Sequence, residues 1–343
     1  MTVPSIVTAE ISSSADTPAD TWSVPRARWL IGLRSPKIVL GLGIVAFFIC
    51  VAIFGPMIDR TDPSALSAAL LQPPSASHWL GTTQTGQDIL AQLITSARVS
   101  LFVGFVAGAI ATVLSLFIGV LGGYLGGIAD ELLSVVSNIF LVIPALPLVI
   151  VLAAYIPGRG ALSVTIVISV TGWAWGARVL RAQTLSIRRR DYVQAARVAG
   201  EGTLRIIVRE IMPNELAIIA ANFLFTVIFA ILTEAGLAFL GLANVSNWSW
   251  GTMLYWAEND SALQLGAWWW FAPPGLCIAL VGTGLALINF GIDEFVNPRL
   301  RTAGIGTAEA ARRRNRRRGW RLGRPALANG AATRSARRDR ARR

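Results

Sequence analysis

The sequence predicts an all-α membrane protein that crosses the membrane six times, with its N- and C-termini both in the cytoplasm. Hydrophobic residues make up 54% of the 343 residues and charged residues only 15%, a balance that excludes an ordinary soluble domain. Six apolar runs are each long enough to cross about 30 Å of hydrocarbon. Arginines gather in the segments that the six runs would place on one side, and this bias predicts the orientation.

The first 37 residues are predicted to be a disordered cytoplasmic arm, because they are rich in Ser, Thr, Ala and Pro and show no apolar periodicity. The run that follows is too long for a secretory leader and lacks a small-residue cleavage site. It is predicted to be the first span, residues 38–58. The polar segment 59–96 is then expected to be an extramembrane loop, whose end, 88–94, forms an amphipathic helix at the interface.

The remaining five spans are predicted at residues 99–124, 132–156, 161–180, 217–242 and 269–290. The second span carries pairs of glycines four residues apart, a spacing that lets helices approach closely, and we expect these pairs to pack within the chain rather than at a dimer seam. They are Gly104, Gly108, Gly119 and Gly123. Six tryptophans in 243–270 are expected to lie in a belt at the interface, with a stacking platform for substrate or a docked protein as the alternative.

Basic residues set the predicted orientation. Residues 1–37 hold four of them, 178–213 hold eight and the stretch from Arg299 onward holds sixteen, whereas 243–268 hold none. The positive-inside rule therefore places the two termini and the 185–213 loop in the cytoplasm. An even number of spans is required for this, and six agrees.

The last residues, 302–343, are rich in Arg, Ala and Gly and are predicted to be a second disordered cytoplasmic arm, which leaves 38–301 as the transmembrane domain. A solvated tail needs no partner, and attraction to anionic lipid headgroups is an equally weighted alternative. Nucleic-acid binding is not expected, because Trp320 is the one aromatic residue among these arginines.

The segment that we call the elbow, residues 191–213, is charged, does not span the membrane and lies between two spans. Asp191 is predicted to cap a short helix, with the Gln194 amide reaching back to the cap. Gly200 suits the left-handed residue that ends such a helix. A second short helix is expected up to Pro213, which would end it. The first helix would present a small-sided surface to a partner, made of Ala195, Ala196 and Ala199.

The elbow resembles the EAA loop of permease subunits of binding-protein-dependent ABC importers. The matching residues are Gln194-Ala195-Ala196, Gly200 and Ile211-Met212-Pro213. Other segments are similar to the dipeptide, oligopeptide and nickel branch of this family, and the resemblance covers about residues 36–301. These segments are His78–Thr82, Gly86–Leu90, Ala97–Leu101, Glu234–Leu242, Trp250–Leu254 and Asn297–Arg301.

Two positions depart from the family pattern. Gln194 stands where a glutamate is usual, and Gln87 stands where an arginine is usual before Asp88. The capping interpretation needs an acceptor at position 194, which glutamine supplies, so the elbow is expected to survive. Any ion pair that the usual glutamate makes with a partner is lost.

The resemblance implies the fold of a type I ABC importer permease in the bacterial cytoplasmic membrane, and a pore-forming subunit that moves peptides. It also implies the partners: a homologous second permease, one or two ATPase subunits that bind ATP and Mg²⁺, and an extracytoplasmic substrate-binding protein. Nickel, haem or another small solute is the alternative cargo, and a membrane-anchored scaffold acting through the Arg-rich tail is a remote alternative. The residues implied to couple to the ATPases are Asp191, Tyr192, Gln194, Ala195, Ala196, Gly200, Ile211 and Pro213.

The sequence contains no phosphate-binding GxxxxGK[ST] loop and no arrangement of a nucleophile with a base, so neither catalysis nor a cofactor of its own is expected. A metal site is not predicted either, because His78 is the single histidine and both cysteines, Cys50 and Cys277, read as buried small hydrophobes. Polar side chains on spans are candidates for the translocation path. They are Asn138, Asn222, Thr226 and Glu234, and for Glu234 a structural hydrogen-bonded role is favoured over contact with cargo.

Overall fold

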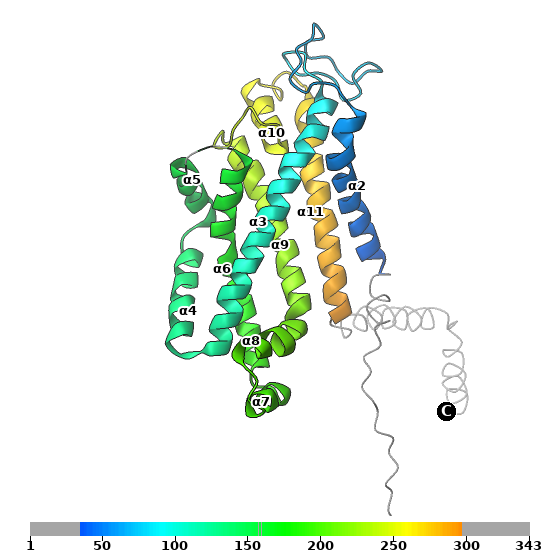
Figure 1. The fold of residues 1–343 in the computed structure, drawn as a ribbon. Helices are drawn as coiled ribbons and strands as arrows, with labels where there is room; N and C mark the ends of the chain where they lie inside the picture. Colours follow the sequence, from blue (N-terminus) through cyan, green and yellow to red (C-terminus); the bar gives the residue numbers. More distant parts are fainter. Residues whose placement is uncertain (1–34, 157, 159, 297–343) are drawn as a thin grey trace, which may run out of the picture.

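A computed structural model describes residues 35–156, 158 and 160–296. Its long helices lie side by side in one bundle, with short helices and loops at both ends (Figure 1). In chain order the elements are α2 (Pro36–Ile58), α3 (Ile89–Leu125), α4 (Gly127–Val142), α5 (Ala145–Tyr155), α6 (Ala161–Ile187), α7 (Asp191–Val198), α8 (Thr203–Ile206), a π turn (Ile207–Ile211), α9 (Met212–Phe239), α10 (Trp250–Asn259) and α11 (Trp268–Val296).

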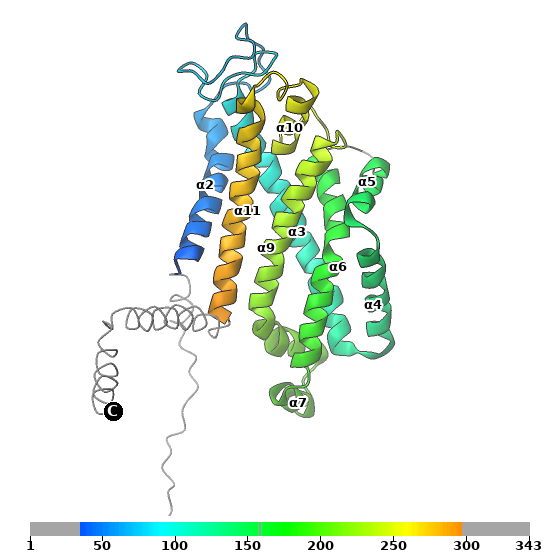
Figure 2. The ribbon, with the colours of Figure 1, turned by 180° about the vertical axis from the view of Figure 1, so that it is seen from behind.

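Six membrane crossings are available within the part of the chain that the structure describes. Five helices are long and apolar enough to span, and the pair α4 and α5 forms a sixth crossing if it is taken as one bent span. In both views this pair lies along one edge of the bundle beside α6, with α4 towards the elbow end and α5 towards the opposite end (Figures 1 and 2). The predicted all-α membrane fold is confirmed.

The third predicted span is not one straight helix. The chain breaks between α4 and α5, which are bent by 94°. Pro144 has no N–H to donate, and a residue before proline avoids the helical region. Accordingly, Ile143 is extended, with φ −72° and ψ 128°. The hydropathy of this run is continuous, so hydropathy alone concealed the break.

Helix α3 corrects a second prediction. Residues 88–94 are not a separate interfacial helix, because α3 runs for 37 residues from Ile89. Asp88 caps it by accepting a hydrogen bond from Ala91 N at 3.0 Å. Arg98 does not interrupt α3, because its Nε donates to the Ala52 carbonyl of α2 at 3.2 Å. Pro56 leaves that carbonyl without a helical N–H partner, so the arginine satisfies an acceptor that is otherwise unpaired.

Smaller differences concern where elements begin and end. Helix α2 starts two residues earlier than predicted, because the Ser35 hydroxyl accepts from Ile38 N at 3.3 Å and Pro36 suits the first helical position. Helix α10 was not predicted, and a capping box between Ser249 and Thr252 begins it. The two arms predicted to be disordered lie, apart from residues 35–37, outside the described residues.

The glycines of α3 allow close packing within the chain, as predicted. A Cβ added to Gly108 would lie 2.6 Å from Val227 of α9, and one added to Gly123 would lie 3.0 Å from the Arg181 carbonyl of α6. The other two glycines face the same two helices in the same order, Gly104 against α9 and Gly119 against α6. Helix α3 therefore packs closely against both α6 and α9.

The predicted tryptophan belt is wrong for two of its six members. Trp250 and Trp270 are only 0% and 1% exposed, within the main apolar core. The Trp250 indole N–H donates to the Leu93 carbonyl at 3.4 Å, and its ring meets Phe48 edge-on at 5.7 Å. These contacts hold α10 down on the bundle, whereas Trp268 is 58% exposed.

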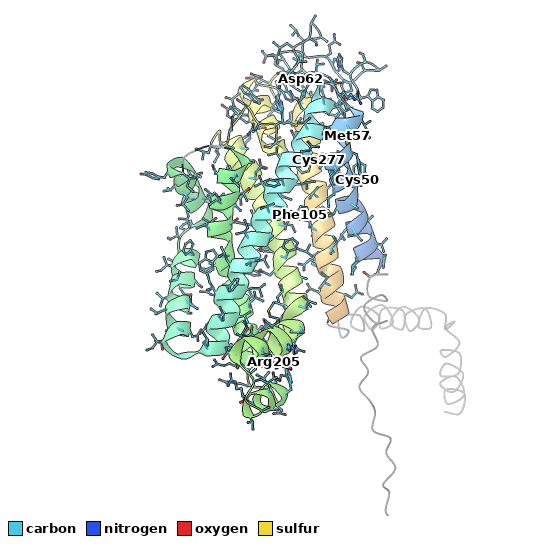
Figure 3. The ribbon with its side chains drawn as sticks, in the orientation of Figure 1. Cys50, Met57, Asp62, Phe105, Arg205 and Cys277 are labelled. Atoms are coloured by element: carbon cyan, nitrogen blue, oxygen red, sulfur yellow. The ribbon has the colours of Figure 1, made fainter. Side chains whose placement is uncertain are left out.

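The two ends of the bundle differ in what they carry. The described chain starts and ends at the same end as the elbow, and the 59–88 loop lies with α10 at the other end (Figures 1 and 2). Figure 3 shows Arg205 of the elbow and Asp62 of the loop at these opposite ends. Which of these ends faces the cytoplasm stays a prediction.

Candidate functional site

The first helix of the elbow ends as predicted. Gly200 has φ 80°, in the left-handed region. The N–H of Glu201 donates to the Ala196 carbonyl at 3.1 Å, and the N–H of Gly200 donates to the Arg197 carbonyl at 3.0 Å. These two bonds are the Schellman pair, which reverses the chain tightly after a helix. The direction in which the chain leaves α7 therefore depends on Gly200.

The predicted cap at the start of α7 is wrong. The cap position is Arg190, which makes no side-chain cap bond, and Asp191 is the first helical residue. Gln194 does reach back, but its Nε2 donates to the Arg188 carbonyl at 2.8 Å. A glutamate has no N–H and cannot make this bond. Glutamine at 194 therefore serves as a donor rather than as the predicted acceptor.

Pro213 does not end the second helix of the elbow. The helical path continues from Thr203 to Phe239, through a π turn at Ile207–Ile211. In that turn the N–H of Met212 reaches the Ile207 carbonyl, one residue further back than in an α-helix. Because the backbone hydrogen bonds of the helix widen to π spacing just before Pro213, the helix continues past this residue, which has no N–H. The elbow is therefore continuous with α9.

One side of the elbow is buried against the bundle. Val193, Ile206 and Ile211 are 0%, 1% and 0% exposed. They belong to an apolar cluster with the ends of α3 and α6, which contribute Val120, Tyr124, Leu180 and Ile187. The elbow is therefore packed directly on the ends of α3 and α6.

Two arginines strengthen this attachment. Arg188 Nη1 donates to the Gly123 carbonyl at 2.8 Å, close to the end of α3, where the helix dipole favours a cation. The Arg197 guanidinium lies 4.7 Å from the centroid of the Tyr124 ring, and its Nε donates to the Tyr124 hydroxyl at 3.2 Å. Both contacts join the elbow to α3.

The other side of the elbow is exposed and partly apolar. Val198 is 90% exposed, Leu204 73% and Val208 50%. This side of the elbow therefore leaves apolar side chains uncovered within the subunit. Tyr192 is also exposed, and desolvation by its partial burial raises the pKa of its phenol above the usual value.

The predicted small-sided surface is partly right. Ala195 and Ala199 are exposed, but Ala196 is half-buried against the apolar cluster. Ile211 is fully buried, so it belongs to the attachment to the bundle rather than to a docking surface.

The four polar residues predicted for the translocation path do not come together. Asn222 and Thr226 are neighbours on α9, where the Thr226 hydroxyl donates to the Asn222 carbonyl at 2.7 Å. Both are buried, and a Cβ at Gly176 would lie 2.5 Å from Asn222 Oδ1, which places this pair between α9 and α6. Asn138 lies instead on the exposed surface of α4.

Glu234 lies towards the α10 end of α9 and is 3% exposed. Its carboxylate accepts a hydrogen bond from the Ser100 hydroxyl at 3.1 Å. The Ser100 hydroxyl oxygen in turn accepts one from the backbone N–H of Trp250 at 3.1 Å. The acid thus joins α9, α3 and α10. This arrangement agrees with the structural role that was favoured for Glu234, while its place on a path stays a prediction.

An apolar hollow of about 720 Å³ lies between α2, α3 and α11. Its walls are almost wholly apolar and include both cysteines, Cys50 and Cys277, which Figure 3 labels on α2 and α11. Cys50 is exposed, so the prediction that it is buried is wrong. The hollow offers no set of polar groups that would orient a hydrophilic cargo.

Comparison with known proteins decides the family. The model of the family described as "binding-protein-dependent transport system inner membrane component" matches residues 112–302, more than half of the chain. The chain belongs to this family. The resemblance inferred from the motifs is confirmed, and the match extends over α4, α5, α6, the elbow, α9, α10 and α11.

Individual members of the family align with most of the chain. The oligopeptide transport system permease protein of Bacillus subtilis is 34% identical, over 79% of this chain and 89% of its own length. The dipeptide transport system permease protein of the same organism is 33% identical, over 78% and 84%. The probable D,D-dipeptide transport system permease protein of Escherichia coli is 33% identical, over 77% and 88%.

Two charged residues of this inner-membrane component were missed by sequence reasoning. Glu215 is fully buried at the start of α9 and accepts from the Thr184 hydroxyl of α6 at 2.8 Å, so it ties the base of α9 to α6. Arg178 was assigned to the cytoplasmic side because of its charge. It also falls inside the predicted span 161–180, and α6 extends seven residues beyond that predicted end, to Ile187, so Arg178 lies well within the helix. The polar residue Asn138 of α4 is its partner, at 2.6 Å.

Proposed function

We propose that the chain is the pore-forming permease subunit of an ATP-driven importer that carries peptides across the bacterial cytoplasmic membrane. The observation that carries this proposal is the elbow, which is buried on one side and exposed and partly apolar on the other, in a chain of this family. Peptides are favoured over nickel, haem or another small solute because the relatives are named for oligopeptide and dipeptide transport.

In this proposal the energy comes from separate subunits. One or two ATPase subunits bind ATP and Mg²⁺ and dock on the exposed side of the elbow, near Val198 and Leu204. When they close, they move the elbow as a rigid unit, because Val193 and Ile206 are packed into the bundle. Helices α3 and α6 then follow, and access to the path changes from one side of the membrane to the other.

The remaining partners follow from the same architecture. A homologous second permease completes the pore, and an extracytoplasmic binding protein delivers cargo to the end that carries α10 and the 59–88 loop. Membrane lipid surrounds the assembly, and no nucleic acid takes part. The subunit itself catalyses no reaction.

Reconstitution tests the function. The subunit alone in liposomes is expected to hydrolyse no ATP and to move no peptide, whereas the complex with its second permease, ATPases and binding protein does both. The measurement is phosphate release together with uptake of a labelled peptide. ATP hydrolysis by the isolated chain above a matched blank would contradict the proposal.

The orientation has a test of its own. In a variant without Cys50 and Cys277, single cysteines are placed at Thr203 in the elbow and at Asn247 before α10, both exposed positions. In intact cells an impermeant thiol reagent is expected to label position 247, and position 203 only after the membrane is opened. Labelling of both positions in intact cells would overturn the proposed sides.

A further inference from the structure

The surface shared by α4, α5 and α6 carries an exposed break in the backbone. Residues 142–147 are all exposed, and they lie between the two ends of the bundle (Figure 1). Pro144 has no N–H, and α5 begins after it without a side-chain cap. Backbone groups at the end of α4 and the start of α5 are therefore without helical partners, which acyl chains cannot supply.

Arg178 lies on the same surface. It is nine residues before the end of α6 at Ile187, which is roughly 14 Å along the helix axis at 1.5 Å per residue. The side chain is exposed, and its Nη2 donates to Asn138 Oδ1 of α4 at 2.6 Å. Among the described residues Arg178 forms no ion pair, whereas Arg181, one turn further on, pairs with Asp130 at 2.9 Å.

The break and the arginine are close together. Asn138 is five residues before Ile143, which is about one and a half turns of helix. A cavity of about 40 Å³ opens beside it between α4 and α6, with Ser134 and Ser137 on one wall and Arg178 and Arg181 on the other. A small group of polar side chains thus lies beside irregular backbone, on a surface whose other exposed side chains, such as Ile139, Val142 and Leu146, are apolar.

Two physical rules restrict what can cover this surface. Irregular backbone at membrane depth is tolerated where it is buried in protein or lines a water-filled cavity. Intramembrane charges follow the same rule and mark the routes of polar solutes. A lipid phosphate would satisfy the arginine but would leave the uncapped backbone of 142–147 against acyl chains.

We propose that the α4–α6 surface lines the water-filled translocation path, and that Arg178 contacts the carboxylate of a peptide in transit. This inference rests on the proposed function. A guanidinium presents several N–H groups in one plane and matches a carboxylate in fork geometry, and only one of its nitrogens is used by Asn138. Asn138 is a positioning residue, because it orients the guanidinium from the neighbouring helix.

A cysteine with reagents of opposite charge tests both parts of the proposal. In the full complex lacking Cys50 and Cys277, Arg178→Cys is expected to lower peptide uptake about tenfold, as for the loss of one charge-assisted hydrogen bond. A thiol reagent carrying a quaternary ammonium group is expected to react and to restore most of the uptake. A sulfonate reagent is expected to react without restoring it. The control is Phe47→Cys on α2, an exposed apolar position that is expected to react with neither.

Each other outcome has a defined meaning. If neither reagent reacts at position 178, the surface is covered by lipid or by the second permease rather than by water, and the inference is wrong. If Arg178→Cys transports as well as the parent complex, or if both reagents act alike on uptake, Arg178 does not contact the cargo. Failure of the proposed function is a different result, in which the parent complex hydrolyses ATP but takes up no peptide. Should Arg178→Cys fail to assemble, Asn138→Cys provides the same test of access by water.

Discussion

Replacing Gly200 by valine is expected to lower ATP-driven uptake about tenfold while the subunit still reaches the membrane in its normal amount. Gly200 has φ 80°, a region that a β-branched residue adopts only with strain of about 1–2 kcal/mol. A strain of about 1.4 kcal/mol corresponds to a factor of ten. No heavy atom lies within 4 Å of the Cβ that the substitution adds, so the whole effect arises in the backbone. Uptake by the reconstituted complex measures it.

Gly202 provides a matched control for this substitution. It lies two residues further along the same turn, and an added Cβ there also meets nothing within 4 Å. Its φ of −68° and ψ of 148° are extended values that valine adopts without strain. Gly202→Val is therefore expected to transport normally. Equal uptake by the two variants would show that the left-handed turn is not needed for coupling.

Much of the architecture could be predicted from the sequence, because it depends on local properties. The apolar runs fixed the number of crossings, and the left-handed residue of the elbow followed from a glycine after a short helix. The predicted start of α3 was wrong. Arg98 resembles the end of a span, but its guanidinium bonds a carbonyl in α2, 46 residues earlier, that Pro56 leaves unpaired. No local pattern indicates such a contact.

In the candidate site, too, local features could be predicted from the sequence, whereas contacts between distant residues could not. The left-handed turn at Gly200 was predicted correctly, but the sequence treated Ala195 and Ala196 as equivalent. Packing separates them, since Ala195 is exposed and Ala196 contacts the cluster at the ends of α3 and α6. Arg178 was counted among the cytoplasmic charges, and its contact with Asn138, 40 residues away in the chain, has no local signal. Which polar residues meet depends on how α4 bends and packs on α6.

Replacing Val198 by arginine is expected to abolish binding of the ATPase subunits and, with it, uptake. Val198 is 90% exposed and is the last residue of α7, so the variant removes no packing inside the bundle. Arginine has a higher helix propensity than valine, and its charge is favourable at a helix C-terminus. The helix should therefore persist, while a long hydrated cation replaces an apolar side chain in the contact. Pull-down of the ATPases with the tagged permease measures the loss.

Leu66→Arg is the control for this experiment, because Leu66 is 73% exposed and lies in the loop at the opposite end of the bundle from the elbow (Figure 1). It adds the same charge to the same subunit and is expected to leave ATPase binding unchanged. Membrane insertion and pairing with the second permease are expected to be normal in both variants. If Val198→Arg retains the ATPases and full uptake, the exposed side of the elbow is not their docking surface. If both variants lose them equally, the added charge alone is responsible, and the elbow has no special part in docking.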